Sequence, residues 1–469
     1  MRKGLIVLLV VVLAAAFAIP VAAADIKASG FYRSKAWLSN FFGRSLSTDA
    51  DDATAAMVEQ RFRVKFDFGN ENVKAVWYLE SDMIYGDAGG GSNPPAPPGR
   101  NTGGALGGDR VQTETKNIYV WFKIPDTSVA VSVGLQAQGD DYANFLYGAD
   151  MAGIFVTGKY EPVSYKLGWA KLYENAAKET DDMTLYTASV TFVPGKDAKL
   201  GLNLYFLQND TARAACPGDL PTCGATGSSN GNLLGYPYAS TVWMPGVDGA
   251  IKAGPATISG FFVYQWGTMD AQSSANKDVD INAYIIDARA DMNLGPGKFF
   301  VEGLYTSGGD DPTDKYESPI TLATNESSPG GNSAYSRANT HILMSSPDTI
   351  NVSQCLLGCS GGVAGADPGN RGRGMWLLAA GYSQKLSEKV KGEVNIGYLS
   401  ATDMLKTDND NRKEGMGTEF NARVDYNLHK GLDVGVIGAY ALVGDFFKDA
   451  AGKTPDDVYM AVARVNYSF

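Results

Sequence analysis

One stretch of the chain alternates charged with apolar side chains. Glu59, Arg61, Arg63, Lys65 and Asp67 share one face of an extended strand, and valine, glutamine and phenylalanine share the other. Because successive side chains of a strand point to opposite faces, the charged face requires water and the other face requires an apolar phase. Such a face can interact with passing ions and dipoles.

The next extended stretch repeats this pattern. Lys74, Tyr78, Glu80 and Asp82 oppose Val73, Ala75, Trp77 and Leu79. Near the end of the chain, residues 419–428 alternate in the same way. An apolar exterior around a charged interior is the inverse of a soluble barrel and fits a barrel in lipid. The alternative, a periplasmic β-sandwich or lectin, requires strands of about five or six residues, which are shorter than these.

Hydrolytic chemistry has little support. An outer-membrane lipase or protease needs a nucleophile–base pair or a metal site, and the only histidines are His341 and His429. We expect His341 in an external loop and His429 in a periplasmic turn, at opposite rims. An acid pair without histidine remains open in principle. We therefore expect no enzyme and no cofactor.

The four cysteines form two pairs that are close in sequence, in stretches rich in glycine, proline and serine. These pairs are Cys216 with Cys223 and Cys355 with Cys359. In an oxidising compartment they are candidates for two local disulfides. Free thiols are the alternative. No histidine lies at the spacing of a zinc site, so we expect no metal.

The beginning of the chain predicts export. Arg2 and Lys3 precede an apolar run, and Ala22-Ala23-Ala24 offers a cleavage site. Residues 1–24 therefore match a secretory signal peptide. No later apolar stretch approaches the roughly 18 residues of a transmembrane helix. The net charge of −11 excludes nucleic acid as the expected partner.

From Asp25 onward, extended segments are separated alternately by short turns and long connections. Eight short turns and nine long connections join about eighteen strands, although sixteen remain possible. This pattern predicts an all-β fold, an antiparallel up-and-down transmembrane barrel with short periplasmic turns and long external loops. The long connections, 307–372 among them, contain too few apolar residues to fold alone, so residues 25–469 form one predicted domain.

The last residues, Val458 to Phe469, alternate between an apolar face and a polar face. We expect this strand to pair with the first strand and close the barrel. The ending, with a hydrophobic residue, tyrosine and a final phenylalanine at alternate positions, resembles the terminal signature of Gram-negative outer-membrane β-barrels. The resemblance to the bacterial porin family extends to the second and third strands and to the third loop, residues 139–152, in which acids and aromatics lie close together.

The resemblance implies that the third loop folds into the barrel as a constriction whose acids face a ladder of basic residues. The constriction and lumen residues implied in this way are Arg33, Lys35, Arg61, Arg63, Lys65, Glu80, Asp82, Asp140, Asp141 and Asp150. The loop lacks the Pro-Glu-Phe-Gly-Gly motif of the family. The alternatives are that the acids are hydrated loop residues and that the basic residues only support the wall. The resemblance also implies a homotrimer in contact with outer-membrane lipid and lipopolysaccharide.

The predicted first strand begins about two residues after the cleavage site, which leaves no chain for an N-terminal plug. A barrel of sixteen to eighteen strands without a plug encloses an aqueous channel. We therefore expect a passive outer-membrane porin for ions and small polar solutes, and the acidic composition slightly favours cations. A substrate-selective uptake channel is the second interpretation. The third is a barrel that sheathes an electron-carrying haem partner, since the chain has no C-x-x-C-H motif of its own.

Overall fold

The computed structural model describes most of the chain from Asp25 onward. The described residues are 25–40, 54–87, 103–108, 111–174, 182–210, 238–271, 277–322, 335, 337–344, 369–408 and 410–469. The expected signal peptide, residues 1–24, and all four cysteines lie outside these ranges.

Nearly all of the regular structure is β-strand. The strands are β1 (Asp25–Ser39), β2 (Ala55–Gly69), β3 (Val73–Ile84), β4 (Glu114–Lys123), β5 (Val129–Gly139), β6 (Gly148–Tyr160), β7 (Val163–Tyr173), β8 (Met183–Gly195), β9 (Ala198–Asn209), β10 (Tyr238–Ala253), β11 (Ala256–Ala271), β12 (Val279–Leu294), β13 (Gly297–Thr306), β14 (Lys315–Tyr316), β15 (Met375–Lys385), β16 (Val390–Ala401), β17 (Gly415–His429), β18 (Leu432–Val443) and β19 (Val458–Ser468). Two 3₁₀ turns, η2 (Asn370–Gly372) and η3 (Asp445–Phe447), lie in connections. The described residues contain no helix with the length and hydropathy that crossing a membrane requires.

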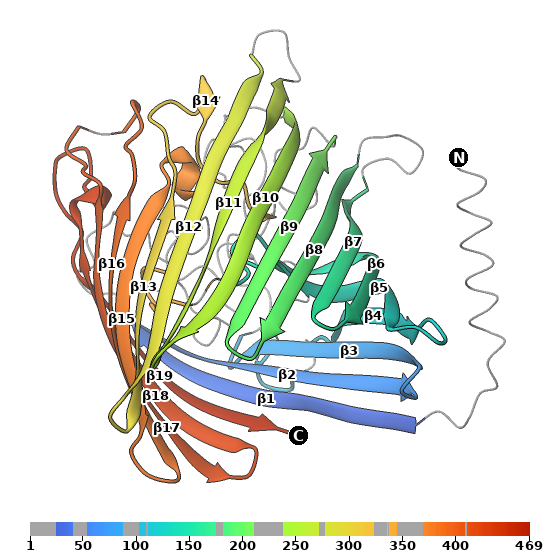
Figure 1. The fold of residues 1–469 in the computed structure, drawn as a ribbon. Coiled ribbons are helices and arrows are strands. Elements are labelled where there is room, and N and C mark those ends of the chain that lie inside the picture. The colour runs from blue at the N-terminus through green and yellow to red at the C-terminus, as the bar shows by residue number, and fades with distance from the viewer. Residues whose placement is uncertain are drawn as a thin grey trace.

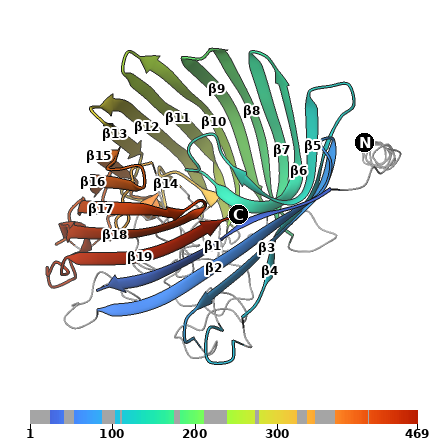
Figure 2. The same cartoon turned by 90° about the horizontal axis from the view of Figure 1, so that it is seen from below.

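The long strands pair with their neighbours in sequence and close into a ring (Figures 1 and 2). The seam joins β1 to β19 in antiparallel register from Phe31 opposite Ser468 to Ser39 opposite Met460. Within the described residues, eighteen long strands form the barrel, and the two-residue β14 adds a short parallel contact to β12. The predicted closed antiparallel barrel of about eighteen strands is therefore confirmed, and sixteen is excluded.

Glycines form several of the tight turns that connect neighbouring strands at one rim. Gly254 and Gly295 each follow a strand directly and have positive φ values of 61° and 58°. A two-residue hairpin turn requires this left-handed conformation, and glycine adopts it without strain. The next strand therefore starts at once, and the longer connections lie at the opposite rim.

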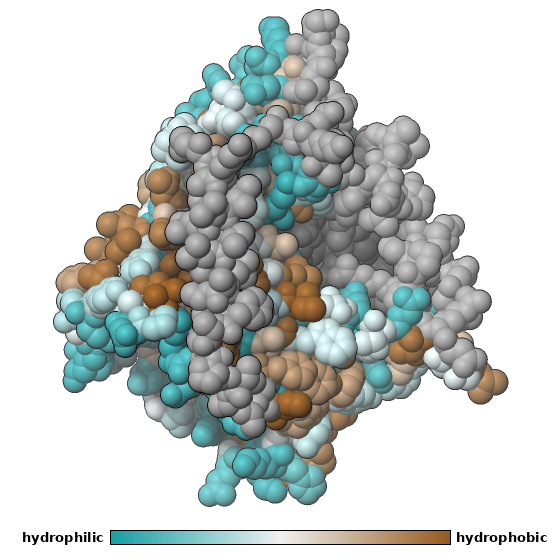
Figure 3. Space-filling model, turned by 90° about the vertical axis from the view of Figure 1, so that its right-hand side faces the viewer, coloured by the Kyte–Doolittle hydropathy of each residue, from teal (hydrophilic) through white to brown (hydrophobic). Residues whose placement is uncertain are grey.

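The outer face of the barrel is apolar. In the middle of β18, Val436 points outward and is 57% exposed, whereas its neighbour Ile437 points inward and is fully buried. On the face in Figure 3, hydrophobic residues gather at mid-height and hydrophilic residues crowd the lower edge. A row of outward aromatic rings crosses β8 to β11, namely Tyr186, Phe206, Trp243 and Trp266. Together, the closed ring, the apolar outer face and the aromatic row are the features of a transmembrane β-barrel.

The sequence predicts a charged inner face throughout, but the inner face of the barrel has two zones. Along β12, the inward residues Val279 to Ile285 are apolar and buried, and charged residues begin only at Asp287. The apolar zone lies toward the long connections. It is covered by segments of the third long connection and of the seventh, residues 307–372, which pack against it as one hydrophobic cluster. The interior is therefore partly filled on this side.

Candidate functional site

The charged zone of the inner wall is densest on β1, β2 and β3. The inward-facing charged side chains of these strands are Asp25, Lys27, Arg33, Lys35, Glu59, Arg61, Arg63, Lys65, Asp67, Lys74, Glu80 and Asp82. The alternation in the sequence predicts most of this set, because the charged residues of each strand are an even number of positions apart. Cations outnumber anions here, although the whole chain is acidic.

Ion pairs between neighbouring strands order the basic residues of this wall. The Arg61 Nε donates a hydrogen bond of 2.8 Å to Oδ1 of Asp82, and the same guanidinium lies 3.4 Å from Glu80. Arg63 also binds Glu80. On the other side, the guanidinium groups of Arg33 and Arg63 lie 5.5 and 5.6 Å from the ring centre of Phe31. These contacts hold the arginines against the wall in fixed positions.

The third long connection folds inward, but its acids have other partners than the basic residues of β1 and β2. Asp140 is buried and accepts hydrogen bonds from the backbone N–H groups of Tyr142, Leu146 and Tyr147. Burial raises the pKa of Asp140 to about 7, more than these three donors lower it. Asp140 therefore stabilises the fold of its own loop.

Asp141 attaches the same loop to the wall. Its carboxylate accepts hydrogen bonds of 2.6 Å from Ser189 on β8 and 2.8 Å from Tyr205 on β9. Within the loop, Ala143 and Asn144 both adopt positive φ values near 60°, which is strained for alanine. Strain of this kind persists only where the surroundings fix it.

Asp150 belongs to β6 and lies beyond the loop. It accepts a 2.8 Å hydrogen bond from the side chain of Asn117 on β4 and pairs with Lys116. The acids that meet Arg61 and Arg63 are thus Glu80 and Asp82 on the neighbouring strand. The predicted opposition between these arginines and Asp140, Asp141 and Asp150 is absent from the described contacts.

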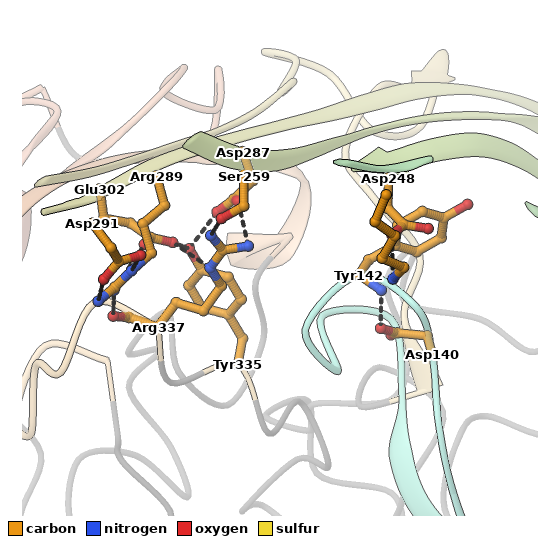
Figure 4. A network of polar contacts seen from close by, with 11 residues as sticks. Asp140, Tyr142, Asp248, Ser259, Asp287, Arg289, Asp291, Glu302, Tyr335 and Arg337 are labelled. Atoms are coloured by element: carbon orange, nitrogen blue, oxygen red, sulfur yellow. Dashed lines mark hydrogen bonds and ion pairs between the residues drawn. The ribbon is translucent and has the colours of Figure 1, made fainter. Parts of the chain in front are cut away.

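Described residues of the seventh long connection, predicted as an external loop, lie against the inner wall. Of these, Tyr335 and residues 337–344 are called the inner strap below. Tyr335 and Arg337 reach Asp287 on β12 and Glu302 on β13, while Arg289 on β12 binds Asp291 and the carbonyl of Arg337 (Figure 4).

The inner strap also contacts the third loop and β17. The rings of Phe145 and Tyr335 are 5.6 Å apart. His341, expected in an external loop, is buried in the strap, and its backbone N–H donates to Glu419 on β17. His429 ends β17 at the short-turn rim as expected. The physical reason for the difference is that Ile342, Leu343 and Met344 bury apolar surface against the wall.

That apolar run was the one signal in the sequence that distinguished the strap from the polar chain around it. The strap's partners Asp287, Arg289 and Glu302 lie on the inner faces of β12 and β13, but their spacing in the sequence does not show which segment will cover them.

The two walls differ in charge. β12 lies half-way round the ring from β3. The inner face there carries Asp287, Asp291 and Glu302, but Arg289 of β12 and Arg337 of the inner strap pair with these acids, whereas the inner face near β3 carries an excess of cations. The unbalanced charge therefore lies near β3, where it can act on passing ions and dipoles. No group of three or more potential metal ligands occurs among the described residues.

No protein-family model matches the sequence, and no curated protein matches it. Solved structures match the whole barrel. OccAB1 of Acinetobacter baumannii has a TM-score of 0.53 at 9% identity, with 96% of this chain and 98% of that chain covered. OccK5 (OpdH) of Pseudomonas aeruginosa has a TM-score of 0.52 at 11% identity, and a BenF-like porin of Pseudomonas fluorescens Pf-5 has 0.52 at 10%, each with 95% and 98% covered. The chain thus has the fold of outer-membrane porins.

Proposed function

We propose that the chain forms a channel through the bacterial outer membrane that passes small polar solutes and prefers anions to cations. One observation carries this proposal, namely the excess of positive charge on the inner faces of β1, β2 and β3 inside a barrel with an apolar exterior. An apolar exterior suits lipid, and a charged inner wall suits hydrated solutes.

Selective passage is favoured over general diffusion. The third loop binds Ser189 on β8, and the inner strap extends the covered wall to Glu419 on β17. The inner faces of β1, β2 and β3, called the basic wall below, leave 12% of the Arg61 side chain and 18% of the Arg63 side chain exposed, whereas Lys35 is buried. A solute that moves along this wall experiences ordered arginines at short range, which favours anionic groups over neutral ones of equal size.

Reversing the charge at Arg61 and Arg63 tests the proposal. We expect purified wild-type protein to give stepwise currents in planar bilayers and a reversal potential that indicates anion preference in a KCl gradient. The double variant R61E/R63E should shift the reversal potential toward the value for cation preference, since the basic wall loses its excess of positive charge. Activity assays for lipase and protease on the same preparation test the absence of catalysis.

The matched control is K430E, which changes charge in the turn after β17 at the rim and outside the wall. The control should leave the reversal potential unchanged. A wild-type preparation that inserts without conducting would contradict the channel. Conduction with cation preference, or with no response to R61E/R63E, would contradict the role of the basic wall.

The remaining expectations belong to this proposal as well. We propose that residues 1–24 are removed on export, that residues 25–469 act as one domain, and that the barrel assembles as a homotrimer in contact with lipopolysaccharide. Mass spectrometry of the mature N-terminus and cross-linking in intact outer membranes test these points.

A further inference from the structure

The inner strap meets the wall mainly through carboxylates. Arg337 places its guanidinium 3.1 Å from Asp287 and 3.3 Å from Glu302, and it donates a hydrogen bond of 2.7 Å to Ser259 on β11 (Figure 4). One arginine of the strap therefore connects three strands of the wall. Both carboxylates are fully buried beneath it.

Tyr335 binds the same two carboxylates. Its hydroxyl lies 2.7 Å from Oδ2 of Asp287 and 2.5 Å from Oε1 of Glu302. A phenol has one proton and can donate to only one of them at a time. The strap is therefore held here by a shared network whose strength depends on where that proton lies.

A second anchor lies on β17. Glu419 accepts hydrogen bonds from three consecutive backbone N–H groups, those of His341, Ile342 and Leu343, at 2.6, 2.9 and 2.9 Å. Next to it, Asn339 donates to Glu393 on β16 at 2.7 Å. At these anchors the strap supplies donors to the carboxylates of the wall, and Arg289 and Asn421 of the wall donate in turn to the backbone carbonyls of Arg337 and Asn339.

Ion pairs and hydrogen bonds of this kind can hold the strap against the wall and still break reversibly. Removing two charges from water costs nearly as much as their attraction returns, so a buried ion pair adds little net stability. In a hydrated lumen, water can solvate Arg337 and the carboxylates again once they separate. The buried side chains of Ile342 to Met344 favour the attached position at rest.

We propose that the inner strap is a gate, attached to the wall at Asp287, Glu302 and Glu419 in the narrow state and detached in a wider state. The inference rests on the proposed channel function and adds to it the element that controls the width of the channel. Ion pairs and hydrogen bonds determine its position, so changing a single donor should alter the population of the two states.

The first experiment releases the strap. We expect R337Q to spend several-fold more time in the larger conductance level than wild type in planar bilayers. The matched control is K199Q, which removes a cation that pairs with Asp248 between β9 and β10, away from the three carboxylates that hold the strap. K199Q should keep the wild-type distribution of levels.

The second experiment fixes the strap. The double variant N339C/E393C places two cysteines where Asn339 and Glu393 now share a hydrogen bond. We expect oxidation to hold the channel in its smaller level and a reducing agent to restore transitions to the larger one. Wild type is treated with the same reagents, because it has four cysteines of its own.

The outcomes separate the two proposals. If wild type conducts but R337Q and oxidised N339C/E393C both keep its levels, the strap is a fixed part of the wall and the gate is wrong. If wild type itself inserts without conducting, the channel function fails and the gate fails with it. Should R337Q not fold, as judged by circular dichroism and heat-dependent gel mobility, the cross-linked variant decides alone.

Discussion

At the scale of single residues, Asp140 connects the loop fold to pH. The pKa of Asp140 is raised from 3.8 to about 7 by burial, so the folded loop binds a proton more tightly than the unfolded chain does. The resulting stabilisation is complete below about pH 4 and is lost as the pH rises through 7. The third loop should therefore open more readily at pH 8 than at pH 5.

Hydrogen–deuterium exchange of the peptide that contains residues 140–147 measures this opening, after correction for the intrinsic pH dependence of exchange. Protection of the amides of Tyr142, Leu146 and Tyr147 should fall between pH 5 and pH 8 in wild type. The variant D140N keeps an acceptor oxygen but cannot titrate, so its protection should not change. An equal change in both proteins would assign the pH dependence to another group.

At the scale of elements, the closing seam depends on the last residue. The backbone of Phe469 exchanges two hydrogen bonds with Gly30 on β1, at 3.0 and 3.1 Å. Its ring lies 6.2 Å from that of Phe62 and 5.9 Å from that of Tyr467. A side chain at position 30 would meet this ring, so Gly30 allows the phenylalanine to cover the seam.

We expect F469A to lower the free energy of unfolding by about 1–3 kcal/mol, since each aromatic pair contributes about 0.5–1.5 kcal/mol. Urea titration of the barrel in lipid vesicles measures the change. The control is Y160A, which removes an outward aromatic at the end of β6, away from the seam. Similar losses in both variants would show that the seam has no special dependence on its final ring.

Much of the barrel could be predicted from the sequence, because a strand with lipid on one face and water on the other must alternate. The third strand, β3 (Val73–Ile84), matches the alternation that begins at Val73, and the short turn at Gly295 lies where glycine and proline predict it. The contacts between strands follow from the same pattern, since Arg61 and Asp82 both face inward.

The inner strap could not be predicted in the same way. Its attachment depends on backbone N–H groups that bind Glu419, and backbone donors have no signature in a sequence. Likewise, Asp140 is an ordinary loop acid in the sequence, and only the folded loop shows that it accepts its own amides. The site depends on contacts between residues that are far apart in the sequence, whereas the barrel follows from the local alternation of apolar and polar side chains.

At the scale of the whole molecule, the solvent that meets the outer face decides whether the barrel spans a membrane. Val436 lies in the middle of β18, points outward and is highly exposed. In a soluble barrel, V436R would place a charge in water and cost almost nothing. In a bilayer, an arginine on the lipid face near the midplane costs about 2–4 kcal/mol.

We therefore expect V436R to lower the free energy of unfolding in lipid vesicles by about 2–4 kcal/mol, as measured by urea titration. The matched variant N466R places the same side chain on the inner face of β19, where water and Asp433 are close by in the pairing register, and should change the free energy much less. Because the two positions lie on neighbouring strands, a difference between their changes in free energy shows that lipid meets the outer face and water meets the inner face. Equal small effects would mean that water surrounds the outer face, and the transmembrane interpretation of the barrel would be wrong.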